Sequence, residues 1–429
     1  MGSSVVAIFI KQGGVFVVKI RGFKAIRPSV DVAKDVASLP YDVLNTEEAR
    51  VLGNANPLSF LHIDKAEIDL AKDVSPYDIS VYQKAASNLA EFQDKGWLAK
   101  DAKPELYLYQ LVMNGRPQTG LVTCTAIDDY VSGAIKKHEL TREEKELDRI
   151  RHVDVTDANT SPIFLTYRSD ATVNEVVDAW ISKHDPVYDF KSFHDVTHRI
   201  WTVDDTDVVN ALTEAFEAIP ALYIADGHHR TESAVKVGLR RRAEHPEASA
   251  DAEFNFFLSV LFPQDQLEIL DYNRVVDVPI ATDFLDQIAA KFDVEKVGKE
   301  AYKPATPNTF GMYLDGSWYG LKVKPEFAGD GVIASLDVSI LADQVLTPLF
   351  GIEDIRRDDR INFVGGIRGL GELEQLVDTR KYTIAFSMYP PTMDNLLDVA
   401  DAGEIMPPKS TWFEPKLLSG LFVHDLESN

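Results

Sequence analysis

A short apolar run that passes through a two-residue turn directly into a helix is the feature of this sequence that most restricts its fold. Residues 221–225 predict a buried strand, Asp226 and Gly227 predict a tight turn, and a helix is expected from about His228 to Glu244. The same succession of strand and helix recurs along the chain. It favours a mixed α/β or α+β architecture.

Other segments fit this pattern by their apolar periodicity and by their caps. The sequence predicts helices at residues 81–97, 172–183, 206–218, 335–350 and 392–402, the last capped by Thr392, and a helix or exposed loop–helix segment at 139–158. It predicts strands at residues 106–112, 120–126, 163–167, 361–364 and 383–388, with Asn114-Gly115 in the loop between the first two. Residues 5–10 and 15–18 predict a hairpin around a Gly-Gly turn.

The charge balance and the cysteine content restrict partners and compartment. The net charge is −24, from 68 acidic and 44 basic residues, which repels nucleic acid and anionic membranes. Cys124 is the single cysteine, so no intrachain disulfide can form, and its apolar neighbours favour a buried small side chain over a nucleophile. With no signal-peptide pattern or membrane span predicted, we expect a cytoplasmic protein that binds neither nucleic acid nor membrane.

The turn at Gly227 has the chemistry of an anion site. A helix that starts here exposes free backbone N–H groups and the positive end of its dipole, and Gly227 lets an anion approach the main chain. Arg230 adds a forked cation, and His228 and His229 add directed donors. The alternative is that Asp226 only caps the helix. A metal shared by the two histidines is awkward, because adjacent helical residues point about 100° apart.

Common nucleotide and metalloprotease motifs are absent from the sequence. There is no Walker A pattern, and residues 366–371 have the wrong glycine spacing for a dinucleotide fingerprint, so a tight strand–helix connection explains them better. His138-Glu139 has no second histidine four residues on, which excludes a zincin helix.

Residues 224–234 resemble the phosphate-binding turn of the ParB/sulfiredoxin superfamily, and within it the free-serine kinases, whose motif also reads Asp-Gly-His-His-Arg. The chain is also similar to a broad bacterial and archaeal family of conserved domains of unknown function, through residues 39–44, 137–141, 148–149, 159–162 and 406–416. Members of that family often carry His-Arg where this chain has Asn273-Arg274. The resemblance implies a ParB/sulfiredoxin-like core at residues 131–250, between an N-terminal α/β segment (1–130) and a C-terminal α/β segment (251–429) that completes the site.

The function implied by this resemblance is a small-molecule kinase. It would transfer a phosphoryl group, with Mg²⁺, from ATP, ADP or another donor to the hydroxyl of free L-serine or a similar metabolite. Superfamily kinases are implied to use a Glu as base, and Glu139 is the candidate, because Lys137 and His138 could hold its carboxylate ionised. The alternative is that Glu139 belongs to a charged surface helix.

The candidate site residues fall into four roles. The catalytic candidates are Glu139, Asp226 and His228, and Asp226 is also the candidate metal ligand. The nucleotide-binding candidates are Gly227, His228, His229, Arg230, Thr231, Lys409, Ser410 and Thr411, the last three in a loop that two prolines hold extended. The substrate-binding candidates are His138, Arg149, Tyr41, Asp42 and Lys416.

Several of these residues also have ordinary structural interpretations. Residues 40–42 resemble a turn, and Asp148-Arg149 resembles a surface ion pair, while Trp180 and Trp201 are assigned to packing. Two other functions stay open: a nucleotide-binding NTPase of the ParB-like superfamily without kinase activity, and a phosphate-ester hydrolase. The expected partners are a nucleotide and a small-molecule substrate, and a homodimer is left open.

Overall fold

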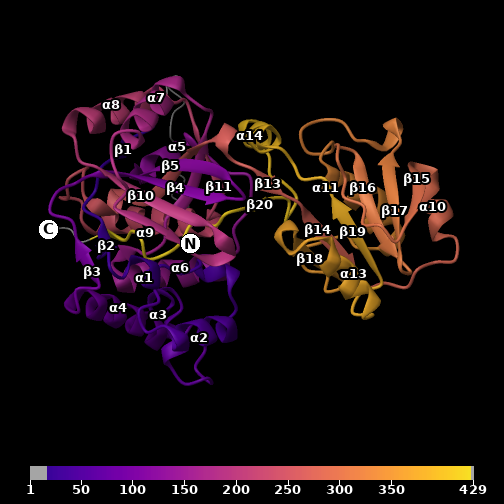
Figure 1. Cartoon of the computed structure of the whole chain (residues 1–429), viewed down its shortest axis with the longest axis horizontal. Coiled ribbons are helices and arrows are strands. Elements are labelled where there is room, and N and C mark those ends of the chain that lie inside the picture. The colour runs from indigo at the N-terminus through magenta and orange to yellow at the C-terminus, as the bar shows by residue number, and fades with distance from the viewer. Residues whose placement is uncertain (1–16, 427–429) are drawn as a thin grey trace, which may run out of the picture.

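The computed structural model describes residues 17–426, which form a larger and a smaller lobe (Figure 1). The larger lobe is built on a nine-stranded mixed sheet with the order β6-β11-β8-β12-β5-β4-β10-β9, and β1 pairs with β5. Its strands are β1 (Ile20–Arg21), β4 (Leu106–Met113), β5 (Arg116–Ala126), β6 (Ile135–Lys136), β8 (Ile163–Tyr167), β9 (Tyr188–Lys191), β10 (Thr197–Val203), β11 (Leu222–Asp226) and β12 (Phe256–Pro263).

Both faces of this sheet are covered, and the alternation along β4 shows why. Leu106 and Leu108 enter one hydrophobic cluster, whereas Tyr107, Tyr109 and Leu111 enter another on the opposite face. Because side chains alternate along a strand, such a fully apolar strand needs a layer on each side. The first cluster includes residues of α7 and α8, and the second includes the C-terminal segment.

Side chains satisfy free N–H groups at the start of several helices of the larger lobe. Asn45 and Glu48 form a capping box at α2, and Asp170 and Asp205 cap α7 and α8. The helices are α1 (Ala33–Val36), α2 (Thr46–Ala55), α3 (Leu61–Asp64), α4 (Ile79–Asp94), α5 (Ile127–Ser132), α6 (Glu143–Thr156), α7 (Ala171–Ile181), α8 (Thr206–Glu217) and α9 (His228–Glu244).

The smaller lobe has a six-stranded sheet with the order β15-β17-β16-β19-β14-β18. Its strands are β14 (Tyr272–Val276), β15 (Phe292–Gly298), β16 (Thr309–Leu314), β17 (Ser317–Val323), β18 (Ile361–Gly365) and β19 (Ile384–Met388). One face of the sheet packs with α10 (Phe284–Lys291), α11 (Asp337–Leu341) and α12 (Thr347–Phe350), and the other with α13 (Leu370–Asp378).

Two crossings of the chain join the lobes. Strand β13 (Ile269–Leu270), where the chain leaves the larger lobe, pairs with β20 (Trp412–Phe413), where the chain returns to it. Helix α14 (Met393–Asp401) packs between the lobes: Leu396 and Leu397 enter the core of the larger lobe, and Val399 enters that of the smaller one. Its last residue, Asp401, accepts hydrogen bonds from Arg168 and Tyr223, so α14 fixes the two sheets relative to each other.

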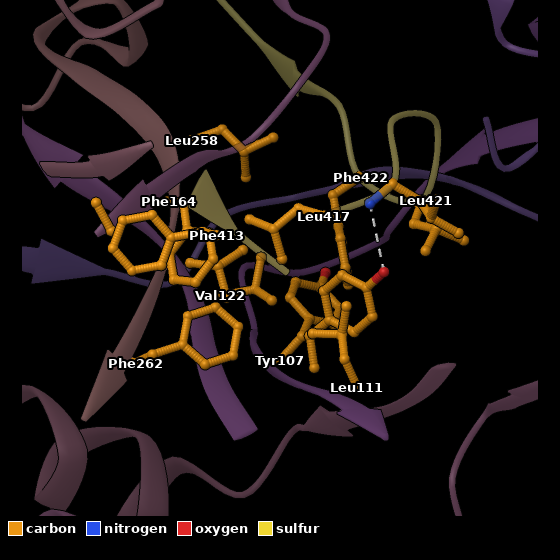
Figure 2. Close-up of a cluster of buried hydrophobic side chains, with 14 of the residues drawn as sticks. Tyr107, Leu111, Val122, Phe164, Leu258, Phe262, Phe413, Leu417, Leu421 and Phe422 are labelled. Atoms are coloured by element: carbon orange, nitrogen blue, oxygen red, sulfur yellow. Dashed lines mark hydrogen bonds between the residues drawn. The ribbon is translucent and has the colours of Figure 1, made fainter. Parts of the chain in front are cut away.

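After β20 the chain returns across the larger lobe. Phe413, Leu417, Leu421 and Phe422 pack against a face of the sheet that includes Val122 (Figure 2). Full burial of such side chains stabilises by about 1.5–3 kcal/mol each. The segment ends in β21 (His424–Asp425), which pairs with β7 (Ala158–Asn159); β2 (Ile26–Pro28) and β3 (Leu98–Lys100) form a further pair.

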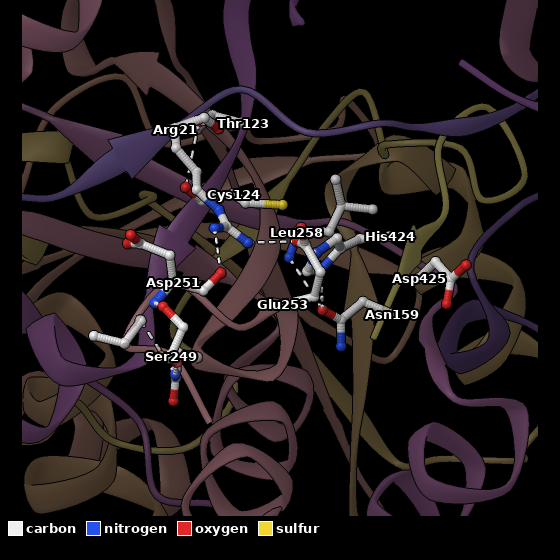
Figure 3. Close-up of polar contacts among 12 residues, drawn as sticks. Arg21, Thr123, Cys124, Asn159, Ser249, Asp251, Glu253, Leu258, His424 and Asp425 are labelled. Carbon is white, nitrogen blue, oxygen red and sulfur yellow. Dashed lines mark hydrogen bonds and ion pairs between the residues drawn. The ribbon is translucent and has the colours of Figure 1, made fainter. Parts of the chain in front are cut away.

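A polar cluster fastens the end of this returning segment (Figure 3). Nε2 of His424 lies 2.8 Å from Glu253, and Nδ1 lies 3.1 Å from Oδ1 of Asn159. Arg21 pairs with Glu253 and stacks 3.7 Å from the ring centre of Phe256. Cys124 is fully buried next to this cluster, and burial raises the pKa of its thiol, which confirms its interpretation as a packed side chain.

The predicted mixed α/β class is confirmed, and most predicted elements are present. The helix predicted at 335–350 begins only at Asp337, because Leu336 has an extended backbone. It also contains a π-helical turn at Ala342–Leu346. Residues 366–369 form the expected connection from β18 to α13, which begins at Leu370, and Trp180 and Trp201 are packed as predicted. The hairpin at residues 5–18 lies largely outside the described residues. Among residues 17–426, none of the helices has both the length and the apolar composition of a membrane span.

Asp337 yields a stability prediction. Burial raises the pKa of this carboxyl to about 7, and its Oδ1 accepts a 2.7 Å hydrogen bond from the backbone N–H of Asn308. Between about pH 4 and pH 7 the folded chain holds a proton that the unfolded chain releases, so stability falls as pH rises through this window. Asp337→Asn keeps the acceptor and removes the charge. We expect it to be near neutral at about pH 4 and to stabilise by up to about 4 kcal/mol at about pH 8.

Thermal unfolding over this pH range measures the effect. Asp343→Asn, at an exposed position in the same helical segment, is the matched control. An Asp337→Asn increment that is independent of pH would contradict the assignment.

Candidate functional site

A cleft of about 760 Å³ lies where the two lobes meet. Every residue predicted for the site lines it except Thr231, although the residues come from widely separated parts of the sequence. They come from the 3₁₀ turn Tyr41–Val43, from the loop before α6 and α6 itself, from the β11–α9 turn, and from the returning segment.

The β11–α9 turn has the geometry of an anion site. The register between β11 and β8 shifts between Ile224 and Asp226, which leaves a bulge next to the turn. Gly227 follows with φ 97° and ψ 31°, in the left-handed region that favours glycine, and acts as the N-cap of α9. The N–H groups of residues 228–230 have no acceptor within the helix. Thr231 is fully buried and donates its hydroxyl to the carbonyl of Gly227, so it supports the turn from behind.

Asp226 is part of a group of four charges at the cleft wall. Its Oδ2 lies 3.3 Å from Nζ of Lys416, and its Oδ1 lies 3.9 Å from Nη2 of Arg230. Arg230 also lies 3.7 Å from Asp42 and donates to the carbonyl of Pro162 at 2.7 Å. Burial alone would raise the pKa of Asp226, but Lys416 and Arg230 hold it below its usual range. No side chain caps α9, so capping by Asp226, the alternative considered above, is not what the structure shows.

Glu139 lies beside the first turn of α9, in the loop between β6 and α6. Its Oε2 is 3.9 Å from Nδ1 of His228, and 45% of its side-chain surface remains accessible from the cleft. The surface-helix alternative does not hold, because α6 begins only at Glu143. Lys137 and His138, which were expected to hold the carboxylate ionised, are not among the main charges that act on it. Enclosure in the cleft raises the pKa of Glu139, and Lys409 is the main cation that opposes this shift.

His138 and His228 form a pair of buried imidazoles next to Glu139. Their rings meet edge to face with centres 4.6 Å apart. Burial lowers the pKa of His138 to about 4, against the opposing effects of Asp226 and the backbone of Ile224, and it lowers the pKa of His228 as well. One ligand atom from each of His138, Glu139 and His228 lies within 4.8 Å of the others, so these residues could hold a metal ion.

His229 points away from this pair. Its Nε2 accepts a 3.0 Å hydrogen bond from the backbone N–H of Arg142, just before α6. The two adjacent histidines therefore face different neighbours, as the helical geometry predicts.

The cleft wall formed by α6 contains a buried ion pair where the sequence suggested a surface pair. Asp148 and Arg149 are not a surface pair: both are buried, with Oδ2 and Nη2 2.8 Å apart. The guanidinium of Arg149 stacks 4.0 Å from the ring centre of Tyr41, and the hydroxyl of Tyr82 donates to Asp148 at 3.0 Å. This packing fixes the cation at the cleft wall.

The returning segment and the smaller lobe form the opposite wall. Lys409 adopts a left-handed backbone (φ 58°), so the loop after the two prolines turns here and is not extended throughout. Arg274 holds this turn by donating to the carbonyl of Lys409 at 3.0 Å. Ser410 is buried, and its hydroxyl donates a hydrogen bond to the carbonyl of Pro407 within the same loop.

Sequence reasoning missed the cleft residues of the smaller lobe and some of their neighbours. They are Tyr272, Ile355, Arg356, Phe363 and Trp412. Of these only Trp412 lies inside a segment that the family resemblance had marked, and no local pattern distinguishes the others. Asn273, where related sequences often have histidine, is buried, and its amide binds Asp271 and the N–H of Met388. It is not among the residues that line the cleft.

Comparisons with solved structures find alignments with low TM-scores and low sequence identity. SbnI with a C-terminal truncation from Staphylococcus aureus aligns with a TM-score of 0.38 and 12% identity, over 70% of this chain and 85% of that one. A conserved hypothetical protein from Pyrococcus furiosus has a TM-score of 0.34 and 13% identity, over 70% and 95% of the two chains. A free serine kinase mutant in complex with ADP has a TM-score of 0.34 and 12% identity, over 72% and 95%.

No curated protein matches the sequence. A family model, described as protein of unknown function DUF1015, matches residues 20–339, which is more than half of the chain. The chain therefore belongs to the DUF1015 family.

Proposed function

We propose that this protein is a phosphotransferase that moves a phosphoryl group from a nucleotide to the hydroxyl of a small metabolite, with free L-serine as the candidate acceptor. One observation carries the proposal: the open N-terminus of α9 and the carboxylate of Glu139 face the same cleft, with 3.9 Å between Glu139 and the first residue of the helix. A phosphate bound at the turn would thus lie next to a base.

The turn suits the transferred phosphate group. Free N–H groups at a helix N-terminus bind phosphate oxygens directly, and the helix dipole favours their negative charge. Arg142, Arg356 and Lys409 also line the cleft and give a negatively charged molecule a local cationic site. A nucleotide needs such a site here, because the chain as a whole carries a charge of −24.

The cleft has the volume of a pocket for a small-molecule ligand. Pockets for single small ligands span about 300–1,000 Å³, and this cleft of about 760 Å³ lies in the upper part of that range. In our proposal the nucleotide phosphates bind at the turn, and ATP or ADP is the donor. Arg149, Tyr41 and Asp42 form the neighbouring wall, where we place the acceptor.

The reaction follows from this arrangement. The acceptor oxygen attacks the terminal phosphorus, the bond from phosphorus to the bridging oxygen breaks, and Glu139 receives the hydroxyl proton. Mg²⁺ would travel with the donor and neutralise charge on its phosphate oxygens. Asp226 is the candidate carboxylate for this ion, although Lys416 engages its Oδ2 in the structure.

Glu139→Gln tests the role of the base. The amide keeps the size of the side chain but cannot accept the proton, so we expect phosphoserine formation to fall about 10²–10⁴-fold while the nucleotide dissociation constant changes little. Product formation is measured with Mg²⁺, L-serine and either ATP or ADP. Glu143→Gln, at the exposed start of α6, is the control. Full activity of Glu139→Gln would remove Glu139 from the mechanism, and phosphate release without acceptor would favour a hydrolase.

Gly227→Ala tests the anion turn. A Cβ here would lie 3.1 Å from Nε of Arg230, and a left-handed backbone is unfavourable for alanine by about 1–2 kcal/mol. We expect nucleotide affinity to fall about tenfold, measured by calorimetric titration.

Gly133→Ala is the matched control for this substitution. Gly133 has φ 88° but open space around its Cβ position and lies outside the cleft. It should therefore lose stability to a similar degree while its nucleotide affinity stays unchanged. Equal loss of affinity in the two variants would contradict the proposal.

A further inference from the structure

We propose that His138, Glu139 and His228 form a binding site for a divalent transition-metal ion, with Zn²⁺ as the best match to the ligands. This goes beyond the proposed function, which needs only the Mg²⁺ that accompanies a nucleotide. Because Glu139 would be a ligand here and the base there, phosphoryl transfer is assayed in the absence of Zn²⁺.

The three side chains come together from two separate parts of the chain. His138 and Glu139 precede α6, and His228 is the first residue of α9. One ligand atom of each lies within 4.8 Å of the others. Ligand atoms around tetrahedral zinc are about 3.3 Å apart. Side-chain rotations that move the ligand atoms by about 1 Å would complete this geometry.

The unpaired ring nitrogens of the two histidines are the second observation. Among residues 17–426, neither nitrogen of His138 has a well-formed hydrogen bond, although the backbone of Ile224 lies near its ring, and Nε2 of His228 has no partner either. Both side chains are at least 95% buried. Buried polar atoms without partners are unfavourable, and a metal ion would give one nitrogen of each ring a partner.

Other buried histidines show that this is not a general property of the fold. His152 binds the carbonyl of Ile63 at 3.1 Å, and His198 binds the hydroxyl of Tyr109 at 2.8 Å. His424 uses both of its ring nitrogens, with Asn159 and Glu253. The histidines with unpaired buried nitrogens are those next to Glu139.

The donor set indicates the class of metal. Two imidazoles and one carboxylate suit zinc and neighbouring first-row ions, whereas Mg²⁺ prefers oxygen ligands alone. Three protein ligands leave a coordination position open to water or to an oxygen of a bound ligand. Glu139 keeps 45% of its side-chain surface accessible, so an ion can reach the site from the cleft.

Direct metal binding by the full chain tests the proposal. The protein is stripped with a chelator and titrated with Zn²⁺ by calorimetry, and with Co²⁺, whose visible absorption reports imidazole and carboxylate coordination. We expect one saturable site, a higher thermal midpoint with Zn²⁺, and reversal of both by the chelator. His138→Gln and His228→Gln should each weaken Zn²⁺ binding at least about 100-fold, because loss of outer-shell partners alone weakens metal sites 10–100-fold.

His152→Gln is the matched control, since His152 is buried and lines the same cleft but already has a partner. Circular dichroism confirms that each variant is folded, and the Zn²⁺-dependent shift of the unsubstituted protein tests the site without any variant. The proposal fails if the full chain shows no saturable Zn²⁺ or Co²⁺ binding, or if both histidine variants bind like the control.

The two proposals fail separately. Zn²⁺ binding without phosphoryl transfer would support the metal site and contradict the kinase. Phosphoserine formation that depends on Glu139, in a protein that binds no Zn²⁺, would overturn the metal site and leave the kinase supported.

Discussion

The pairing of Asp226 with Lys416 is the interaction on which the cleft depends. It joins the end of strand β11, second from the edge of the large sheet, to a lysine 190 residues further along the chain. Without this partner, Asp226 would keep only Arg230 to oppose the effect of its burial. The lysine is therefore held where the strand ends, and with it the segment that closes one side of the cleft. Arg230 shares the same carboxylate from the first turn of α9 and extends the charge pairing to Asp42 in the 3₁₀ turn Tyr41–Val43.

The hydrophobic core makes this long-range pairing possible. The segment after Trp412 buries Phe413, Leu417, Leu421 and Phe422 on one face of the large sheet (Figure 2). Its end is fixed by His424 and Glu253 (Figure 3). Because apolar burial anchors the segment on both sides of Lys416, the ion pair does not have to order the chain by itself. The smaller lobe is thus an insertion between β13 and β20, and these paired strands bring its residues to the edge of the cleft.

The parts of the site that depend on local contacts can be predicted from the sequence, and the parts that depend on long-range contacts cannot. The β11–α9 turn is local: an apolar strand, a glycine and a helix start lie within a dozen residues, and the structure has them where the pattern puts them. The tight loop around Asn114 and Gly115 and the cap at Thr392 are local as well. The position of Arg356 in the cleft depends on how the smaller lobe docks, which no short window records. The burial of Arg149 depends on stacking with Tyr41, a residue more than a hundred positions away. In the sequence only the neighbouring Asp148 is visible, and it suggested a surface ion pair.

The first turn of α9 combines three separate functions because successive helical residues point in different directions. The backbone amides face along the helix axis toward the cleft, His229 turns to the start of α6, and His228 turns to His138 and Glu139. Of the two adjacent histidines, His229 therefore contacts the start of α6, and His228 pairs with the ring of His138. Its partner, His138, reaches the same point because β6 pairs in parallel with β11 and delivers the following residues to the same edge of the sheet. The register of one short edge strand therefore decides whether Glu139 lies beside the β11–α9 turn at all.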